Sequence, residues 1–565
     1  MNSQKTKSLR NGRRGSAVSV AALMAALSIG ASLSPAIPVK GASAASKPVP
    51  SRKTTASSPP NIVFILSDDL GWADVGFHGS EIRTPTLDAL AKKGVQLNRY
   101  HTYAVCSPTR AALMSGRSSL ETGVDAPVAL DASLPMDSKI LPQYLKQQGY
   151  QTALAGKWHL GQAEVAWMPF SRGFDSFYGF LGGFIDHYKH LTPEGLLDWQ
   201  RDGVSIREEG YTTDLITREA VARIKSRDKS KPLFLYIAYD APHTPLQAPE
   251  ADVKAYSNIT DLRRRTYAAM VTHFDAQLAQ VIETLDAEHI SKDTLIVWAS
   301  DNGGQIGAGS RNLPLRGGKG TSFEGGERVP AVAYWPGHIQ GGKSIEQTVT
   351  VLDWFPTLLT LAKAEVPSDP RIVGHDVIGA LTGRAYAPAT IVMGNHAQGE
   401  GYYESVFEGP WKLMRAAVQA FTQLPAGLEA PPNRVLPARV TGPTAVQLFN
   451  VATDPAEKDD VASAHPDIVA RLLKQLEAAP RAPRSLSEWA GGGRRNPGGQ
   501  GPGPAGGPRA PGAGPPPGRG PGAGPPQGGG PADDNLPGGG PFASYGPERG
   551  QPVAEAAVGA RAKTN

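Results

Sequence analysis

The sequence is nearly free of cysteine: Cys106 is the one thiol among 565 residues. A single cysteine cannot close an internal disulfide, and it cannot supply the cysteine cluster of a structural zinc site. Three roles are left for it: packing, one reactive atom, or chemical modification. Packing is the ordinary role of a free cysteine, because such residues are usually small buried hydrophobes.

Long hydrophobic runs are also scarce. The apolar run "AVSVAALMAALSIGASL" follows a basic start and precedes the small residues "GASAAS", a pattern typical of an export signal over residues 1–46. This run is short for a membrane span, which needs about 20 apolar residues, and no second such run follows. We therefore expect an exported protein, periplasmic or secreted, with no stable membrane anchor. The single cysteine and the form of the signal favour a bacterial source, and Arg13-Arg14 leaves the choice between general and twin-arginine export open.

A basic surface for nucleic acid is missing as well, although the net charge is +5 and the pI is about 9.0. The positive charges gather at the two ends of the chain, in the export signal and in the segment after Gly491. The middle is neutral to acidic, and it holds no basic stripe interleaved with aromatic residues. The sequence therefore predicts no nucleic-acid partner.

Strand-like and helix-like stretches alternate through residues 61–385, after a linker at residues 47–60. Four apolar runs are candidate buried strands: "NIVFILS", "YQTALAG", "PLFLYIAY" and "TLIVWAS". Alternation of this kind predicts an α/β domain with a large, mostly parallel sheet sandwiched by helices.

Two further segments follow this domain. Residues 386–480 contain shorter strand-like pieces ("YYESVFEG", "WKLMRAA", "VQLFNV") and the helical pattern "PDIVARLLKQLEAA", which predict a smaller α+β subdomain. Residues 491–565 are rich in Gly and Pro without the strict repeat of collagen, and we expect a disordered tail there.

Acidic and amide side chains follow two of the predicted strands. Asp68-Asp69 comes after the first strand, and Asp301-Asn302 comes after "TLIVWAS". An isolated Asp-Asp pair is usually a solvated turn. Ligands of α/β sheets, however, bind outside the carboxyl ends of the strands, where these four side chains would converge. Oxygen ligands without His or Cys favour Ca²⁺ or Mg²⁺ over zinc.

Cationic and titratable side chains mark the other strand ends. They are Lys157 and His159 in "GKWHLG", His243 in "APHTPL", and Lys319 in the glycine-rich "LRGGKGTSFEGG". Taken singly, such residues are usually surface charges or structural histidines. Beside a metal site they predict a pocket for a dense tetrahedral anion.

Cys106 lies at the start of the predicted helix "SPTRAALMSGR", with Pro108 in its first turn. The positive end of a helix favours anions, so a thiolate nucleophile is the first interpretation. Cysteine-hydrolase chemistry, however, has no need of a hard cation.

Cys106-Ser107-Pro108-Thr109-Arg110 resembles the C-x-P-x-R signature of the type I sulfatases, of the alkaline phosphatase superfamily. "GKWHLG", "LRGGKG" and "QLFNVATDPAEKDDVA" resemble further motifs of that family, in the family's order, from Asn61 to about Ala479. The softer feature "GFIDHYKH" is similar to the arylsulfatase and N-acetylgalactosamine-4-sulfatase branch.

This resemblance implies hydrolysis of a sulfate ester by Cα-formylglycine, which a separate maturation enzyme makes from Cys106. The hydrated aldehyde attacks sulfur, and its second hydroxyl then expels sulfate. The resemblance implies a metal site, Ca²⁺ rather than Mg²⁺, formed by Asp68, Asp69, Cys106, Asp301 and Asn302. It further implies that Arg110 and Lys157 hold the formylglycine, that His159 is the base for the second step, and that His243 and Lys319 bind sulfate and protonate the leaving oxygen.

Two other functions remain open at this point. One is a phosphate or phosphonate monoester hydrolase on the same fold; the other is a protein that binds sulfated glycans with Cys106 unconverted. The substrate also stays open, since Asp186, His187 and His190 are either sugar-binding residues or ordinary loop polars.

Overall fold

The structure is a computed structural model that describes residues 58–137, 139–384, 390–397, 401–416 and 446–482. The predicted export signal, most of the linker and the Gly/Pro-rich tail lie outside these residues. The predicted domain boundaries therefore stay predictions.

All four predicted strands are present within a residue of their expected bounds. They are β1 (Asn61–Ser67), β4 (Gln151–Lys157), β8 (Leu233–Ala238) and β9 (Thr294–Ser300). Every residue of β1, β8 and β9 is buried. Burial on both faces explains why these strands are continuous apolar runs rather than alternating ones.

Within the described residues, ten strands form one sheet in the order β11-β2-β10-β9-β1-β8-β4-β5-β6-β7. The central strands, from β9 to β5, are parallel. β10 is antiparallel to both of its neighbours, and β6 and β7 extend the other edge antiparallel. The prediction of an α/β sheet is confirmed, and the edges make the sheet mixed. The added strands are β2 (Val95–Leu97), β5 (Ser176–Phe180), β6 (Gln200–Arg201), β7 (Val204–Ser205), β10 (Ala331–Tyr334) and β11 (Lys343–Ile345).

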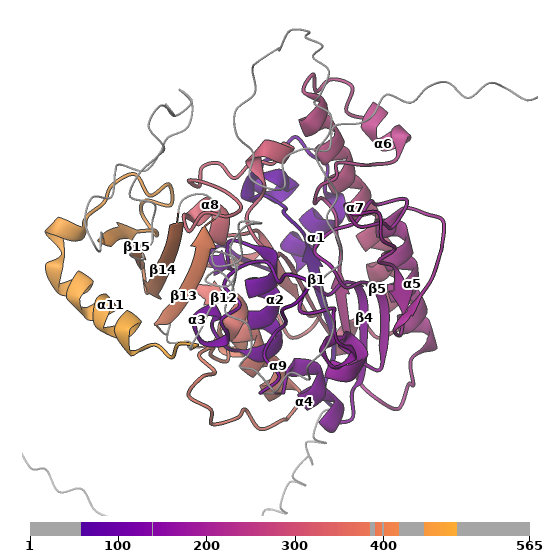
Figure 1. The fold of residues 1–565 in the computed structure, drawn as a ribbon, viewed down its shortest axis with the longest axis horizontal. Coiled ribbons are helices and arrows are strands. Elements are labelled where there is room, and N and C mark those ends of the chain that lie inside the picture. The colour runs from indigo at the N-terminus through magenta and orange to yellow at the C-terminus, as the bar shows by residue number, and fades with distance from the viewer. Residues whose placement is uncertain (1–57, 138, 385–389, 398–400, 417–445, 483–565) are drawn as a thin grey trace, which may run out of the picture. The chain divides into compact units, whose positions relative to one another are not determined.

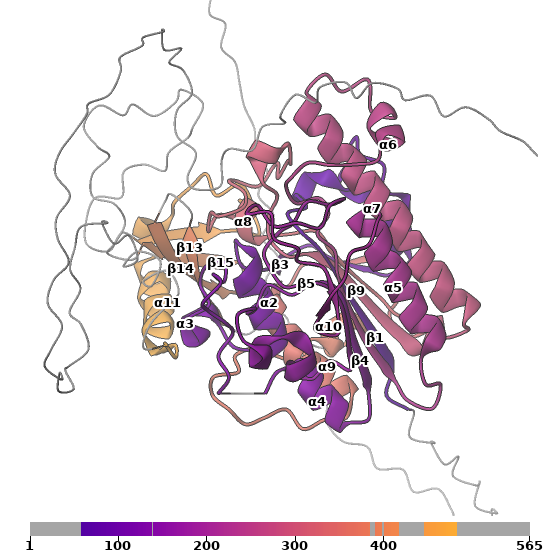
Figure 2. The same ribbon diagram turned by 45° about the vertical axis from the view of Figure 1, so that its right-hand side comes forward.

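Helices cover both faces of this sheet, as Figures 1 and 2 show. Val63 and Ile65 of β1 pack with α1, α5 and α7, whereas Ile62, Phe64 and Leu66 pack with α2, α4 and α9. The first group is α1 (Pro85–Lys93), α5 (Thr212–Ser226) and α7 (Leu262–Ala287), joined by α6 (Glu250–Lys254). The second group is α2 (Cys106–Ser115), α4 (Leu141–Gln147) and α9 (Trp354–Leu361). None of the described helices combines the length and apolar character needed to cross a bilayer.

A smaller antiparallel sheet follows toward the C-terminus, which confirms the predicted α+β part. It consists of β13 (Ile391–Ala397), β14 (Gly401–Glu408), β15 (Trp411–Ala416) and β16 (Val446–Asn450). The predicted closing helix is α11 (Pro466–Ala478), whose Ile468, Leu472 and Leu476 pack on this sheet. Their spacing of four residues places them on one face of the helix.

The remaining elements are short. They are α3 (Ser119–Thr122), α8 (Glu324–Glu327), α10 (Ile378–Leu381), and the paired strands β3 (Tyr100–His101) and β12 (Val349–Thr350). Turns of 3-10 helix cover Trp72–Asp74, Gly76–His78, Val165–Trp167, Pro169–Arg172, Ser291–Asp293, Ile306–Ala308, Val351–Asp353 and Ala462–Ala464.

A buried group of charges joins the small sheet to α8, and we call it the Lys412 cluster. The Nζ atom of Lys412, in β15, lies 3.2 Å from a carboxylate oxygen of Glu324, 3.1 Å from Glu327 and 3.0 Å from Glu457. His101 contacts Glu324 at 3.0 Å and completes the cluster. All five side chains are fully buried. The cluster therefore ties β15 and the segment after β16 to the helix that follows the Lys319 loop.

Candidate active site

The carboxylates predicted to converge lie at the ends of two neighbouring strands. Ser67 of β1 pairs with Ser300 of β9, so Asp68-Asp69 and Asp301-Asn302 leave the sheet side by side. All four are at most 1% exposed. Asn302 Nδ2 donates to Asp69 Oδ1 over 2.7 Å, and the Asp69 amide donates to Asp301 Oδ1 over 3.3 Å. Parallel pairing thus brings together residues more than 230 positions apart.

Three predicted cations lie against these carboxylates. Lys157 Nζ donates to Asp68, and Lys319 Nζ donates to Asp69 Oδ2 over 2.8 Å. Arg110 Nη2 donates to Asp301 Oδ2 over 2.7 Å and to Asp68 Oδ2 over 3.4 Å. We call these acidic and basic residues, with Asn302, Cys106, His159 and His243, the strand-end site.

Burial and charge act differently on the two carboxyl groups that Arg110 contacts. Burial raises the pKa of Asp68, but the charges of Lys157 and Arg110 outweigh it and hold that pKa well below its ordinary value. At Asp301, burial and the charge of Asp68 raise the pKa to about 6 in spite of Arg110. Ionising every carboxyl group here is therefore costly unless a further positive charge is present.

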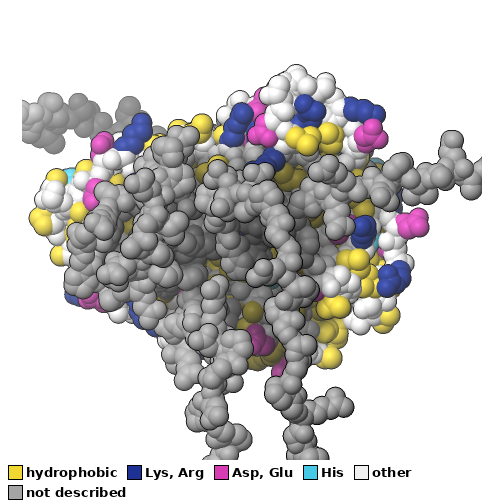
Figure 3. Space-filling model, turned by 45° about the horizontal axis from the view of Figure 1, so that its top comes forward, with side chains coloured by type: hydrophobic (Ala, Val, Ile, Leu, Met, Phe, Trp, Pro, Cys, Tyr) yellow, Lys and Arg dark blue, Asp and Glu magenta, His cyan; other side chains and the backbone are white. Residues whose placement is uncertain are grey.

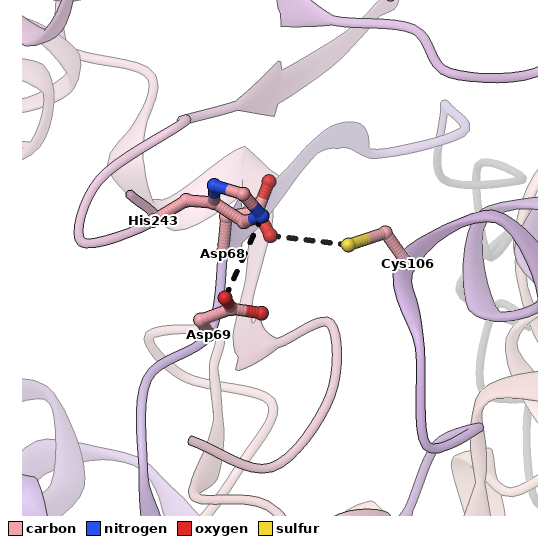
Figure 4. Close-up of side chains that lie close together, drawn as sticks. All are labelled: Asp68, Asp69, Cys106 and His243. Atoms are coloured by element: carbon pink, nitrogen blue, oxygen red, sulfur yellow. Dashed lines mark hydrogen bonds and ion pairs between the residues drawn. The ribbon is translucent and has the colours of Figure 1, made fainter. Parts of the chain in front are cut away.

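Cys106 is the first residue of α2, and its side chain points at the acidic pair (Figure 4). Its Sγ donates to Asp68 Oδ1 over 3.3 Å, and the residue is 2% exposed. Burial, followed by the charges of Asp301 and Asp68, raises the pKa of the thiol well above its ordinary value. The cysteine is thus a neutral thiol at neutral pH, which argues against the thiolate interpretation.

His243 faces Lys319 and the acidic pair. Its Nδ1 lies 2.6 Å from the Thr244 carbonyl oxygen, which can only accept, so Nδ1 carries the proton. Nε2 then accepts from Lys319 Nζ at 3.0 Å, and it lies 3.6 Å from Asp69 Oδ2. Burial and the charge of Lys319 lower the pKa of His243 to about 4, so the ring is neutral.

His159 is held in the left-handed region, with φ 56°. Burial, with the charges of Lys157 and Arg110, holds its pKa well below the ordinary value. Its buried Nδ1 has no hydrogen-bond partner within the described structure. A Cβ at Gly183 would come within 2.9 Å of the ring, so the site needs glycine there. The result is a neutral imidazole kept close to Lys157 and Arg110.

The carboxylate and amide oxygens of Asp68, Asp69, Asp301 and Asn302 suit a hard divalent cation. Ligand atoms of Asp68, Asp69, Cys106 and His243 all lie within 4.8 Å of one another. Asn302 Oδ1 is buried without a hydrogen-bond partner among the described residues, which is the kind of orphan that a metal ion satisfies. Carboxylate and amide oxygens in one place are ligands typical of Ca²⁺ and Mg²⁺.

The three loop residues whose role the sequence left open, Asp186, His187 and His190, have hydrogen-bond partners within the protein. His190 is 1% exposed, and its Nε2 donates to the Gly210 carbonyl oxygen. Asp186 accepts from Gln247 and from the amides of Tyr188 and Lys189. His187 is equally buried and contacts the loop of His243. These contacts hold the three side chains to the rest of the protein.

The Lys412 cluster is the part of the surroundings that sequence reasoning missed. Glu457 accepts from the amide of Glu324, and its carbonyl oxygen accepts from Arg316 Nη1, in the loop that carries Lys319. No motif spacing signals these contacts, because they depend on how the small sheet packs against the large one.

Several known proteins and solved structures are similar to this chain. The sulfatase family model matches residues 60–364. Mouse arylsulfatase J is 35% identical over 464 residues, which cover 76% of this chain and 77% of that protein. Human N-acetylgalactosamine-6-sulfatase is 33% identical over 353 residues, covering 58% of this chain and 66% of that protein.

Solved structures agree with these matches. The crystal structure of Ps i-CgsB in complex with k-i-k-neocarrahexaose has a TM-score of 0.67 at 32% identity, covering 77% of this chain and 96% of that one. The PsFucS1 sulfatase from Pseudoalteromonas has the same fold, with a TM-score of 0.62 at 24% identity, covering 75% of this chain and 92% of that one. The family match spans more than half of the sequence, and together with the mouse relative it shows that the chain belongs to the sulfatase family and hydrolyses sulfate esters.

Proposed function

We propose that this sulfatase acts on an aryl or carbohydrate sulfate through a formylglycine made from Cys106, with Ca²⁺ held by Asp68, Asp69, Cys106, Asp301 and Asn302. One observation carries the proposal: a buried neutral thiol starts a helix and points into a group of carboxylates and cations. Such a thiol is a poor nucleophile, whereas its aldehyde hydrate would place a hydroxyl at the same point. A bound cation would supply positive charge that favours the ionised hydroxyl.

The surrounding residues have complementary tasks in this proposal. Arg110 and Lys157 balance the charge of Asp68 and keep the residue at position 106 oriented. Lys319 and His243 form a donor and acceptor pair beside Asp69, where they bind the sulfate group and supply the proton for the leaving oxygen. His159 is neutral, and its buried Nδ1 has no partner among the described residues, so it takes up the proton when sulfate is expelled.

The substrate class rests on the relatives. N-acetylgalactosamine-6-sulfatase names a sugar substrate, and Ps i-CgsB was solved with an oligosaccharide. In Figure 3, both acidic and basic side chains are visible around the edge of the face, among the described residues that grey atoms leave uncovered. We further propose that the chain is exported, periplasmic or secreted, after loss of residues 1–46, and that it is bacterial.

The mass of the tryptic peptide Tyr100–Arg110 tests the proposal. The protein should come from cells that contain a formylglycine-generating enzyme, and it should be assayed with an aryl sulfate and the matching aryl phosphate. We expect a mass with aldehyde in place of thiol, together with faster release of sulfate than of phosphate. An unmodified Cys106 in active protein would contradict the mechanism, and preferred release of phosphate would favour a phosphoryl substrate.

A further inference from the structure

His243 lies in a turn that is outside any helix or strand. β8 ends at Ala238, and residues 239–249 belong to neither a helix nor a strand. Within the turn, the His243 amide donates to the Asp240 carbonyl oxygen over 2.8 Å. Besides the contacts of the ring itself with Thr244 and Lys319, the position of His243 therefore depends on what holds the other side of its peptide group.

His187 provides that contact from the loop after β5. Its Nε2 lies 3.1 Å from the His243 carbonyl oxygen, which can only accept, so Nε2 carries a proton. Its Nδ1 lies 3.1 Å from Asp240 Oδ2 and 3.0 Å from Thr212 Oγ1. His187 thus joins both ends of the turn, the carboxylate of Asp240 and the carbonyl of His243.

The pair of His187 and Asp240 is sealed from solvent, at 1% and 2% exposure. Burial lowers the pKa of His187, but the charge of Asp240 outweighs it and raises that pKa above its ordinary value. The reciprocal effect lowers the pKa of Asp240 against its burial. A charged imidazolium has two N-H donors, one for each end of the turn. A buried charge pair also orients more firmly than a neutral hydrogen bond.

We propose that His187, held by Asp240, is a positioning residue for His243 and acts on the departure of the leaving group. The inference rests on the proposed function of His243 and Lys319. When the ester S–O bond breaks, the electron pair stays on the leaving oxygen, which takes a proton from the Lys319 and His243 pair. That transfer needs His243 Nε2 to stay beside Lys319 Nζ, and a turn that swings loses this geometry.

A series of aryl sulfates with leaving phenols of rising pKa tests the inference, because proton donation matters most for poor leaving groups. The full-length, matured protein is used. For His187→Gln we expect kcat/KM to fall by less than about 3-fold with 4-nitrophenyl sulfate, and by about 10- to 100-fold with an alkylphenyl sulfate. A loss that is equal along the series would overturn the inference, since general damage to the site has no such dependence.

His190→Gln is a matched control from the same loop. His190 is buried to the same degree and donates to a main-chain carbonyl, but its partner is Gly210, and its ring stacks on Trp199. We expect a change in kcat/KM that does not depend on the leaving group. A leaving-group dependence as steep as that of His187→Gln would show that disturbing this loop is enough, and it would also overturn the inference.

Asp240→Asn keeps the inference testable if His187→Gln does not fold. The new side chain has nearly the same size but no charge, so His187 loses the partner that favours its second ring proton, while Nε2 can still donate to the His243 carbonyl oxygen. We therefore expect the same dependence at a smaller size. Absence of any dependence in Asp240→Asn would count against the inference. The wild type tests the proposed function separately. If it releases no sulfate from any ester of the series, the roles proposed for His243 and Lys319 are wrong, whatever the His187 variant does.

Discussion

The strand-end site and the Lys412 cluster are both buried groups of charges, yet they differ in what their residues leave open. In the strand-end site, His159, His243 and the Lys319 side chain keep 7% to 13% exposure, and Asn302 Oδ1 and His159 Nδ1 have no partner in the described structure. In the Lys412 cluster all side chains are fully buried, and each of three carboxylates lies within 3.2 Å of one ammonium group.

This difference shows that a buried charge does not by itself mark an active site. The Lys412 cluster holds two packed parts of the chain together, and its three carboxyl groups all lie against one lysine of the protein. Parts of the strand-end site are open to solvent, and two of its buried polar atoms have no partner among the described residues. Variants in the first should therefore cost stability, and variants in the second should cost activity.

The largest effect is expected in the strand-end site. Cys106→Ala removes the precursor of the proposed nucleophile, and we expect sulfate release to fall by at least about 1,000-fold. The melting temperature should change little, because Ala fills most of the same space. Steady-state kinetics and differential scanning calorimetry on the same preparation check both parts. A variant that keeps its activity would remove Cys106 from the mechanism.

Lys412→Met is the counterpart in the Lys412 cluster. It removes the one ammonium group that three buried carboxyl groups share, and we expect the free energy of unfolding to fall by about 3 to 5 kcal/mol. Denaturant titration measures this loss, and the activity of the folded fraction should stay near that of the wild type.

Arg471→Met serves as the control for Lys412→Met, because its ion pair with Glu408 is half exposed. We expect a loss below about 1 kcal/mol there. Equal losses in the two variants would mean that the Lys412 cluster is no more than an ordinary ion pair.

Metal removal should affect the strand-end site alone. A chelator should lower the free energy of unfolding, and Ca²⁺ at about 100 times its Kd should restore about 3 kcal/mol. Asn302→Ala removes the orphaned oxygen and should weaken this Ca²⁺-dependent gain, whereas Lys412→Met should retain it. Thermal melts with and without Ca²⁺ make the comparison.

The pH dependence of stability should report on the Lys412 cluster. Burial raises the pKa of Glu327 from 4.5 to about 8, against the pull of Lys412. Between these pH values the folded protein keeps a proton that the unfolded chain releases. The free energy of unfolding should therefore fall as pH rises toward 8, by up to about 1.4 kcal/mol per pH unit, and this contribution should level off above that pH. Denaturant titrations from pH 5 to 9 should show a weaker dependence in Glu327→Gln.

Much of this contrast could not be predicted from the sequence. The four central strands and α2 were predictable because burial on both faces and helix-start residues leave strong local patterns. The convergence of Asp68-Asp69 and Asp301-Asn302 at the strand ends followed from the same reasoning. Edge strands such as β6 and β7, of two residues each, are too short for any pattern.

The Lys412 cluster was hidden for a different reason. Lys412 and Glu324 are 88 positions apart, and only the packing of the small sheet brings them together. In the sequence each is an unremarkable charge. His187 was likewise visible as a residue, but not as a partner of the His243 carbonyl oxygen, because tertiary hydrogen bonds decide which way a loop side chain points.

The strand order of the large sheet also determines how late in synthesis the surroundings of Cys106 are completed. Asp301, which helps to enclose Cys106, follows β9, and β9 is synthesised about 190 residues after Cys106. At the usual pace of translation, about 5 to 20 residues per second, this leaves roughly 10 to 40 seconds. Once β9 has paired with β1, the thiol is 2% exposed. Any enzyme that converts Cys106 is therefore best served by the nascent chain, before the fold closes around its target.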